Sequence, residues 1–295
     1  MYLVFDVGGT NTKYALMDDQ ANIKFKDRFS TIRTSKEEFI RSLEKVVEIY
    51  RNEIDSIALS MPGFVDSDTG FMVNGGSLDY IKNWNIVDDL SERFNMKVSV
   101  ENDAKCAALA EHWKGNIKDY KNCVVIVLGT GVGGAIIIND EIYKGRDLTA
   151  GEFSFILSNM DSNKEISDAI GWNISVPNMV KNVSEKLKLN KENSNGEYIF
   201  ELANNRNEVA LEEIRKYMSK LAFLIYNLNF IINPDIFAIG GGISRQSLTY
   251  KILLEEIDKI YDSIGFDLKK PDVINCKFFN DANLIGALHN HLKKI

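Results

Sequence analysis

The chain carries one local pattern twice, and this repeat limits the folds open to it. In each copy an apolar strand ends in a glycine-rich turn and a second strand follows, first over residues 2–17 and again over residues 123–138. Helical spacing of apolar residues predicts helices at 35–51, 103–113, 174–187, 208–232, 248–260 and 284–292. Alternating strands and helices indicate an α/β fold. The repeat favours a duplicated α/β unit with a cleft between its halves and a first boundary near residues 115–120.

Composition and charge exclude several classes of protein. The 295 residues are 45% hydrophobic and 26% charged, which is ordinary for a globular chain of one large or two medium domains. With 35 basic and 42 acidic residues the formal net charge is −7, so non-specific binding of nucleic acid is not expected. No apolar run is long enough for a membrane span, and the first residues lack the pattern of a secretory signal. The widely spaced Cys106, Cys123 and Cys276 match no disulfide framework or metal knuckle, so a reducing cytoplasm is expected.

The first glycine turn has the composition of a phosphate-binding hairpin. Gly8 and Gly9 allow the backbone to approach a ligand closely and to present its N–H groups. The other candidate residues of this turn, which include two hydroxyls and a cation, are Thr10, Asn11, Thr12 and Lys13. Asp6, at the end of the first strand, is placed to bind a metal ion through water. Taken alone, the segment is equally compatible with a plain surface hairpin.

The second turn, residues 129–134, superficially contains a dinucleotide-binding fingerprint. That fingerprint requires a helix to follow, whereas residues 135–138 predict a strand, so we reject a dinucleotide-binding fold. Four glycines in six residues lose backbone entropy that a simple hairpin would keep, and this favours a second phosphate-binding hairpin. Its candidate residues are Gly129, Thr130, Gly131 and Gly133.

A third glycine cluster, Gly240, Gly241 and Gly242, lies between a predicted strand and a predicted helix. N–H groups exposed at the start of a helix suit an anion or a flat nucleotide ring. Close packing of the strand on the helix explains the same glycines equally well.

Two acidic segments are candidates for catalysis and sugar binding. Asn102 and Asp103 lie where a strand gives way to a helix, and a helix N-terminus favours a charged carboxylate, which can accept a proton from a hydroxyl. By itself, an ordinary helix cap explains this pair better. Glu152 follows a glycine and offers two oxygens to neighbouring sugar hydroxyls, although a solvated loop acid is the simpler local interpretation.

The order of these blocks along the chain resembles the ROK family. The blocks are residues 6–13, Glu-Asn-Asp-Ala from Glu101, Leu-Gly-Thr-Gly-Val-Gly-Gly from Leu128, Ala-Gly-Glu-Phe from Ala150, Gly-Gly-Gly-Ile-Ser from Gly240, and the closing segment 281–287. The family contains bacterial sugar kinases and sugar-responsive repressors. It has the actin-like, hexokinase-type ATPase fold, a duplicated ribonuclease H-like unit in two lobes. The resemblance covers nearly the whole chain.

The resemblance implies a phosphotransferase that uses ATP and Mg²⁺ and acts on a hexose hydroxyl, usually the 6-hydroxyl. Asp103 matches the catalytic base, and Asn102 and Glu152 match sugar contacts. Gly63, Gly76 and Ser77 match the wall beside the sugar. Residues 8–13 and 129–134 match the two phosphate loops, and residues 240–242 match the adenosine site. The smaller lobe is expected at residues 1–117, completed by the final helix at 284–295, and the larger one at 118–283. Related kinases are commonly dimers.

Three departures from the family pattern bear on the substrate and on metal binding. Many members have a histidine at the position of Phe155, where it touches both sugar and zinc, and a glycine at the position of Ser154. A cysteine-rich zinc loop should follow, yet residues 159–168 contain no cysteine, so no zinc is expected. These changes resemble a zinc-less branch that includes β-glucoside kinases. Phe155 would then offer a stacking surface to an apolar sugar face or an aglycone, which predicts a cellobiose-type β-glucoside kinase. Glucokinase and N-acetylmannosamine kinase are the alternatives.

Two further interpretations come from the same family. A repressor of this family needs a DNA-binding helix-turn-helix before the first hairpin. Here the hairpin begins at residue 2, and the acidic net charge agrees with the exclusion of a repressor. A sugar sensor without catalysis stays open because of the departures at the sugar site, although Asp103 and both phosphate loops argue against it.

Overall fold

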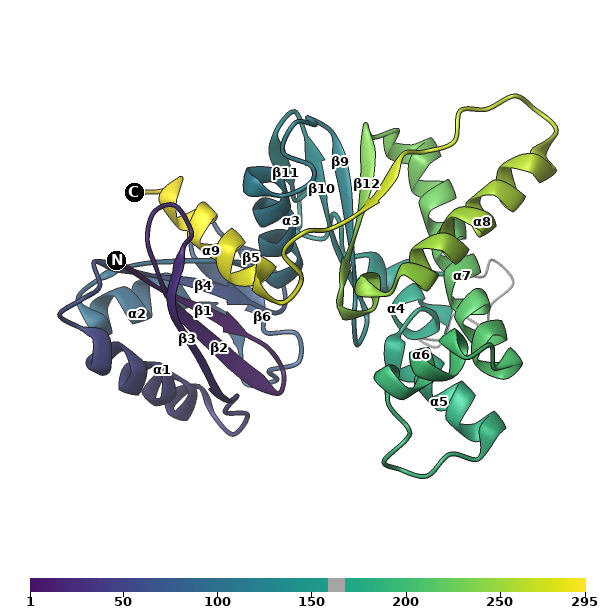
Figure 1. Ribbon diagram of the computed structural model, residues 1–295. Coiled ribbons are helices and arrows are strands. Elements are labelled where there is room, and N and C mark those ends of the chain that lie inside the picture. The colour runs from purple at the N-terminus through teal and green to yellow at the C-terminus, as the bar shows by residue number, and fades with distance from the viewer. Residues whose placement is uncertain (159–167) are drawn as a thin grey trace. The chain divides into compact units, whose positions relative to one another are not determined.

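The computed structural model describes residues 1–158 and 168–295, and the chain forms two compact units (Figure 1). The first unit comprises residues 1–118, 144–149 and 280–295, and the second comprises residues 119–143 and 150–279. Each has its own five-stranded sheet with helices, which confirms the expected α/β class. The sequence-based division places residues 118, 144–149 and 280–283 in the second lobe, whereas their contacts group them with the first unit.

The sheet of the first unit brings the ends of three strands into one row. Its strands are β1 (Tyr2–Val7), β2 (Asn11–Met17), β3 (Ile23–Ser30), β4 (Ser56–Met61) and β8 (Lys97–Asn102), in the order β3-β2-β1-β4-β8. β1 is parallel to β4, and β4 is parallel to β8. The register pairs Asp6 with Ser60 and Ser60 with Glu101, so these three residues lie side by side at the carboxyl ends of the strands.

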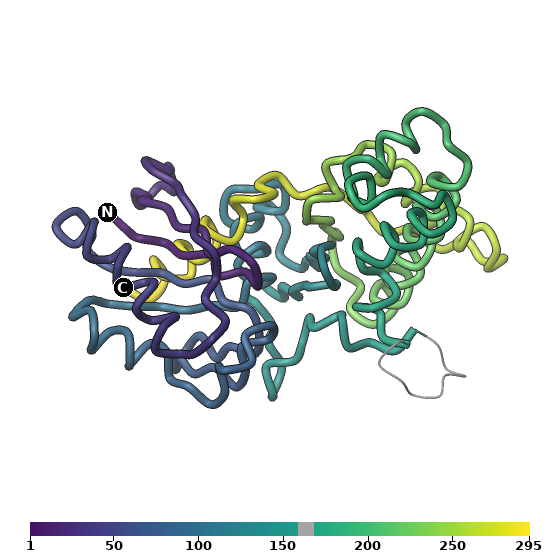
Figure 2. Tube along the Cα trace, turned by 90° about the horizontal axis from the view of Figure 1, so that it is seen from below, coloured from purple at the N-terminus to yellow at the C-terminus, as the bar shows by residue number. Residues whose placement is uncertain are grey.

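Four helices and a small sheet complete the first unit. The helices are α1 (Lys36–Tyr50), α2 (Ile86–Phe94), α3 (Asp103–Lys114) and α9 (Ala282–Leu292), and the small sheet contains β5 (Val65–Asp66), β6 (Phe71–Asn74) and β7 (Lys82–Asn85). α9 packs on α3 and on strands β1, β4 and β8. Figure 2 shows this yellow C-terminal helix among the purple and blue N-terminal segments. The hydroxyl of Ser35 accepts a hydrogen bond from the N–H of Glu38 and so caps α1.

The second unit repeats the arrangement of a glycine-turned hairpin beside a parallel strand. Its strands are β9 (Cys123–Leu128), β10 (Val132–Ile138), β11 (Glu141–Tyr143), β12 (Ile236–Gly241) and β13 (Val273–Asn275), in the order β11-β10-β9-β12-β13. β9 pairs antiparallel with β10 and parallel with β12. In the first unit, β1 pairs with β2 and β4 in the same way.

Helices of the second unit build its core around α7. Those that the structure describes are η1 (Phe153–Phe155), α4 (Ile170–Asn173), α5 (Val176–Leu187), α6 (Gly196–Asn204), α7 (Glu208–Ile232), η3 (Gly242–Arg245) and α8 (Ser247–Ile264). A last turn, η4 (Phe279–Asp281), leads from the second unit back into the first. Ile214, Leu221 and Ile225 of α7 are fully buried in this core. α7 has the predicted bounds, but α5 begins two residues later than predicted. Ser175 caps it by accepting the N–H of Asn178, and a proline occupies its first turn.

Candidate active site

The first glycine turn, between β1 and β2, holds a buried carboxylate under a lysine. Asp6 is 5% exposed, and its Oδ2 accepts a hydrogen bond from Nζ of Lys13 at 3.1 Å. Its Oδ1 accepts from Oγ of Ser60 at 3.2 Å and from Nδ2 of Asn283 at 2.9 Å. Three hydrogen bonds therefore fix the carboxylate of Asp6, and one of them holds the half-buried ammonium of Lys13 beside the turn.

A threonine pair fixes the shape of the same turn. The hydroxyls of Thr12 and Thr31 lie 2.9 Å apart, and Thr31 donates to the carbonyl of Gly8 at 2.7 Å. Thr12 is fully buried, so its hydroxyl supports the turn from within. Thr10 is exposed, whereas Gly8, Gly9 and Asn11 are half-buried. Thr31 was not predicted from the sequence, because it lies just after the strand that follows the hairpin and outside any motif.

The predicted wall beside the sugar forms one connected set of loops. Gly63 has a φ of +96°, and a Cβ placed on it would lie 2.2 Å from the carbonyl oxygen of Asn74. A Cβ on Gly76 would lie 3.1 Å from the nitrogen of Gly63, so the two glycines abut. Oγ of Ser77 lies 2.9 Å from the position a Cβ of Gly9 would take. The structure thus brings together the predicted sugar-side wall and the first phosphate turn.

Asn102 and Asp103 occupy the junction of β8 and α3. Asn102 is the N-cap of α3, since its Oδ1 accepts the N–H of Lys105 at 3.1 Å, as the alternative interpretation predicts. Its Nδ2 donates to the carbonyl of Gly63 at 2.9 Å. Asp103 is the first residue of α3 and is half-buried, and its Oδ1 accepts the N–H of Ala104 at 2.8 Å. The cap therefore also connects Asp103 to the sugar-side wall.

The second glycine turn is fixed by a serine. Oγ of Ser154 accepts the N–H of Val132 at 2.9 Å and donates to its carbonyl at 3.1 Å. The N–H of Val176, at the start of α5, donates to the carbonyl of Gly129 at 3.0 Å. Thr130 is exposed at the tip, while Gly131 and Gly133 are half-buried. The serine that departs from the family pattern is thus part of the turn's support.

Glu152 and Phe155 lie at either end of the short helix η1. The side chain of Phe153 is buried against Gly134, whereas Phe155 is 62% exposed. The N–H of Phe155 donates to the carbonyl of Glu152 at 3.1 Å, which joins the two residues through one turn of backbone. Glu152 itself is half-buried. The aromatic side chain of Phe155 is therefore largely exposed.

The third glycine cluster combines close packing with an open surface. Gly241 has a φ of +93°, and a Cβ on it would lie 2.0 Å from the carbonyl oxygen of Leu128. A Cβ on Gly240 would lie 3.2 Å from the sulfur of Cys276. A Cβ on Gly242, which begins η3, would have nothing within 4 Å. The first two glycines are needed for packing, and the third leaves room for a ligand next to the second turn.

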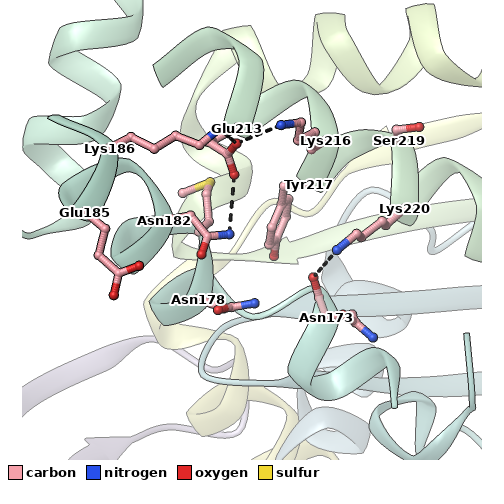
Figure 3. A pocket seen from close by; sticks show the side chains of 11 residues that line it. Asn173, Asn178, Asn182, Glu185, Lys186, Glu213, Lys216, Tyr217, Ser219 and Lys220 are labelled. Carbon is pink, nitrogen blue, oxygen red and sulfur yellow. Dashed lines mark hydrogen bonds and ion pairs between the residues drawn. The ribbon is translucent and has the colours of Figure 1, made fainter. Parts of the chain in front are cut away.

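A separate pocket of about 570 Å³ lies between α5 and α7 (Figure 3). At its centre Glu213, 6% exposed, accepts hydrogen bonds from Lys186 at 2.7 Å, Lys216 at 3.0 Å and Asn182 at 3.3 Å. Burial opposes ionisation of Glu213, but the two lysines outweigh it and hold its pKa below the ordinary value. The Tyr217 hydroxyl is buried and has no hydrogen-bond partner among the residues that the structure describes. None of the site residues predicted from the sequence lines this pocket.

The donor groups present bear on metal binding. Within residues 1–158 and 168–295, no three His, Cys, Asp or Glu side chains gather in a way that could hold a metal ion. Asp6 offers a single carboxylate, which fits an Mg²⁺ ion carried by nucleotide phosphates and contacted through its waters. The zinc-loop prediction falls almost entirely on residues 159–167, outside the described residues, and stays a prediction.

The length and polarity of the helices bear on whether any of them could cross a membrane. Among the helices that the structure describes, not one combines the length and the apolar character needed to cross a membrane. The longest, α7, carries charged residues along its first half.

Comparison with known proteins agrees with this architecture. A curated β-glucoside kinase from Klebsiella pneumoniae is 26% identical over 97% of this chain and 94% of its own length. An N-acetyl-D-glucosamine kinase from Vibrio atlanticus is 26% identical over 99% of this chain and all of its own length. The crystal structure of a ROK family protein from Streptococcus pneumoniae in complex with sucrose is 28% identical. It superposes with a TM-score of 0.88 over 99% of this chain and 98% of that one, which confirms the actin-like ATPase fold.

The sequence model of the ROK family matches residues 2–293, nearly the whole chain. The two curated relatives named above are carbohydrate kinases, and they align with this chain over almost their full length. This chain therefore belongs to the ROK family and is a carbohydrate kinase.

Proposed function

We propose that this carbohydrate kinase transfers the γ-phosphoryl group of ATP to the 6-hydroxyl of a β-glucoside such as cellobiose. The observation that carries the proposal is the fixed pair Asn102 and Asp103. Asn102 is hydrogen-bonded to both α3 and Gly63, which ties the helix start that carries Asp103 to the predicted sugar-side wall. A carboxylate at a helix N-terminus is stabilised in its charged form and can accept a proton from a hydroxyl.

In this proposal each site residue of the first unit has one role in the reaction. The loop at Gly63, Gly76 and Ser77 orients the sugar, and Asn102 holds the cap. The 6-oxygen forms a bond to the γ-phosphorus while the bond from that phosphorus to the β–γ bridging oxygen breaks. The hydroxyl proton passes to the carboxylate of Asp103, and ADP leaves. Such a transfer depends mainly on positioning and charge neutralisation, so a modest base suffices.

The nucleotide is assigned to the glycine turns. Backbone N–H groups at Gly8 and Gly9, with the ammonium of Lys13, suit the terminal phosphates. In the second unit, residues 129–131 offer a second phosphate loop and the open Gly242 offers room for adenosine. Mg²⁺ bound to the phosphates would neutralise charge on them, and Asp6 would contact its waters.

The choice of a β-glucoside rests on Phe155 and Glu152. Glu152 can accept two hydrogen bonds from neighbouring hydroxyls of the glucose unit. The exposed ring of Phe155, one helical turn away, offers an apolar face to a substituent at the anomeric carbon. Curated β-glucoside kinases among the relatives support the same choice.

The three cysteines are buried thiols that form no disulfide, which supports the expected cytoplasmic location.

Release of ADP from Mg-ATP across a panel of sugars tests the proposal. The panel contains cellobiose, aryl β-glucosides, glucose, N-acetylglucosamine and N-acetylmannosamine. We expect the highest kcat/KM with a β-glucoside. Turnover on a free hexose far above that on the glucosides would move the substrate to glucose or an N-acetylhexosamine, and turnover on none, with sugar binding retained, would favour a sensor.

Substitution of the proposed base tests the mechanism in the same assay. Asp103→Asn should lower kcat by about 10²–10⁴-fold and leave sugar affinity nearly unchanged. Asp19→Asn is the matched control, because Asp19 is an exposed acid of the same unit. An Asp103→Asn enzyme with wild-type kcat would remove Asp103 from catalysis.

A further inference from the structure

We propose that Lys144 and Glu101 form a buried ion pair that positions the catalytic Asn102-Asp103 segment. This inference rests on the proposed function and names two positioning residues for its reaction. Glu101 is 2% exposed at the end of β8, directly before Asn102. Its Oε2 lies 2.7 Å from Nζ of Lys144, and its Oε1 accepts the N–H of Asn102 at 2.8 Å.

Both oxygens of Glu101 are thus used, and each use has a separate consequence. The bond to the N–H of Asn102 fixes the peptide plane that leads from the sheet into α3. The ion pair compensates the charge that burial would otherwise disfavour. A buried carboxylate that loses its cation tends to take up a proton or to turn toward water, and either change loosens its hold on Asn102. The position of Asp103 therefore depends on a lysine that acts on it through Glu101 and Asn102.

Lys144 is itself held tightly at this place. Its side chain is 17% exposed, and Nζ also donates to Oγ of Ser67 at 2.5 Å. The backbone carbonyl of Ser67 accepts from Nζ of Lys294, which lies near the C-terminus. Asp66 and Asp68 complete the charged surroundings of the pair. Lys144 is thus surrounded by strand β8, the loop at Ser67 and the last residues of the chain.

The location of Lys144 in the chain gives the pair its significance. Lys144 follows strand β11 of the second unit, yet residues 144–149 belong to the first unit. The chain then re-enters the second unit at Ala150, two residues before the proposed sugar contact Glu152. One ion pair therefore anchors residues 144–149, within the first unit, on the strand end that leads to Asp103.

The test compares Lys144→Met with Arg146→Met. Arg146 lies in the same segment and carries the same charge, but its side chain is 94% exposed and forms a long ion pair of 3.8 Å with Asp147. We expect Lys144→Met to lower kcat by about 10- to 100-fold with little change in the KM for sugar, because misplacement of a catalytic group acts on the transition state. Lys144→Arg should recover most of the rate, and Arg146→Met should behave as wild type.

Amide hydrogen exchange gives a readout that does not need kinase activity. In Lys144→Met, the peptide containing residues 101–104 should exchange faster, while β1 and α9 keep wild-type protection. Wild-type kcat and exchange in Lys144→Met would overturn the inference. So would a rate loss accompanied by faster exchange throughout the first unit, because that result indicates a structural role alone. If the wild-type enzyme phosphorylates no sugar, the proposed function fails, and exchange at residues 101–104 still decides whether the pair positions this segment.

Discussion

The hydroxyl of Ser154 engages both polar backbone groups of Val132, accepting its N–H at 2.9 Å and donating to its carbonyl at 3.1 Å. A single side chain thereby fixes the residue at which the second glycine turn enters β10. Space around this hydroxyl is tight, since a Cβ on Gly131 or Gly171 would lie 2.9 or 2.5 Å from it. The serine thus joins three segments of the second unit at the proposed phosphate loop.

Ser154→Ala should weaken ATP binding more than sugar binding. The substitution leaves a buried N–H without this acceptor, which costs about 1–3 kcal/mol and loosens the turn. We expect the KM for ATP to rise about 5- to 10-fold with the KM for sugar unchanged. Steady-state kinetics with each substrate varied in turn measure this difference, with Ser263→Ala, an exposed serine of α8, as the control. Equal changes in both KM values would contradict the assignment of this turn to the nucleotide.

Gly63→Ala should damage the sugar side of the first unit. Any side chain at this φ is strained by about 1–2 kcal/mol, and here the new Cβ also collides with the carbonyl of Asn74. Displacement of that loop also disturbs the hydrogen bond from Asn102 to Gly63. We therefore expect the KM for sugar to rise at least about tenfold, together with a lower melting temperature.

Gly265→Ala is the control for Gly63→Ala, because it introduces backbone strain without a steric collision. Gly265 has a similar φ of +75° but nothing within 4 Å of its Cβ position. This variant should lose about 1 kcal/mol of stability and keep wild-type kinetics. If both variants keep the wild-type KM for sugar, the loop at Gly63 does not line the sugar site.

Many helices and hairpins of this fold can be predicted from the sequence, because local residues mark both where they begin and where they end. The bounds of α7 are predicted to the residue because Asn207 caps its start, accepting the N–H of Ala210, and Asn233 ends it in the left-handed conformation before a proline. The paired glycine turns likewise predict the two hairpins. Local chemistry alone specifies these elements, so their prediction requires no tertiary information.

Elements and contacts that depend on distant residues were not predictable. Strand β3 was not predicted although Ile23, Phe25 and Phe29 alternate with polar residues, because the strand is largely exposed and charged and becomes evident only when it pairs with β2. Glu101 and Lys144 are 43 positions apart, and Thr31 meets Gly8 across 23. Motifs locate the candidate residues, but the groups that hold them are supplied by tertiary packing.

Phe155→Ala should change substrate preference without changing stability. The ring is 62% exposed, so its removal creates no cavity. Loss of an aromatic contact worth about 0.5–1.5 kcal/mol should raise the KM for aryl β-glucosides about two- to tenfold and leave that for glucose unchanged. Phe266→Ala is the matched control, because Phe266 is a 76% exposed phenylalanine of the same unit. Identical shifts for glucose and the glucosides would mean that Phe155 does not contact the aglycone.

His291 should make the first unit less stable as the pH falls. The ring is 1% exposed between the hydroxyls of Ser56 and Ser99, and burial lowers its pKa from 6.5 to about 4. The unfolded chain binds a proton near pH 6.5 while the folded protein does not, so stability is full above that pH and falls from about pH 6.5 down to pH 4. The expected slope is about 1.4 kcal/mol per pH unit for this group, and His289, whose pKa is also lowered to about 4, adds its own share. Urea unfolding of His291→Gln between pH 4 and 7 should therefore show a shallower dependence than wild type, whatever its absolute stability, and an unchanged slope would mean that His291 is protonated in the folded protein.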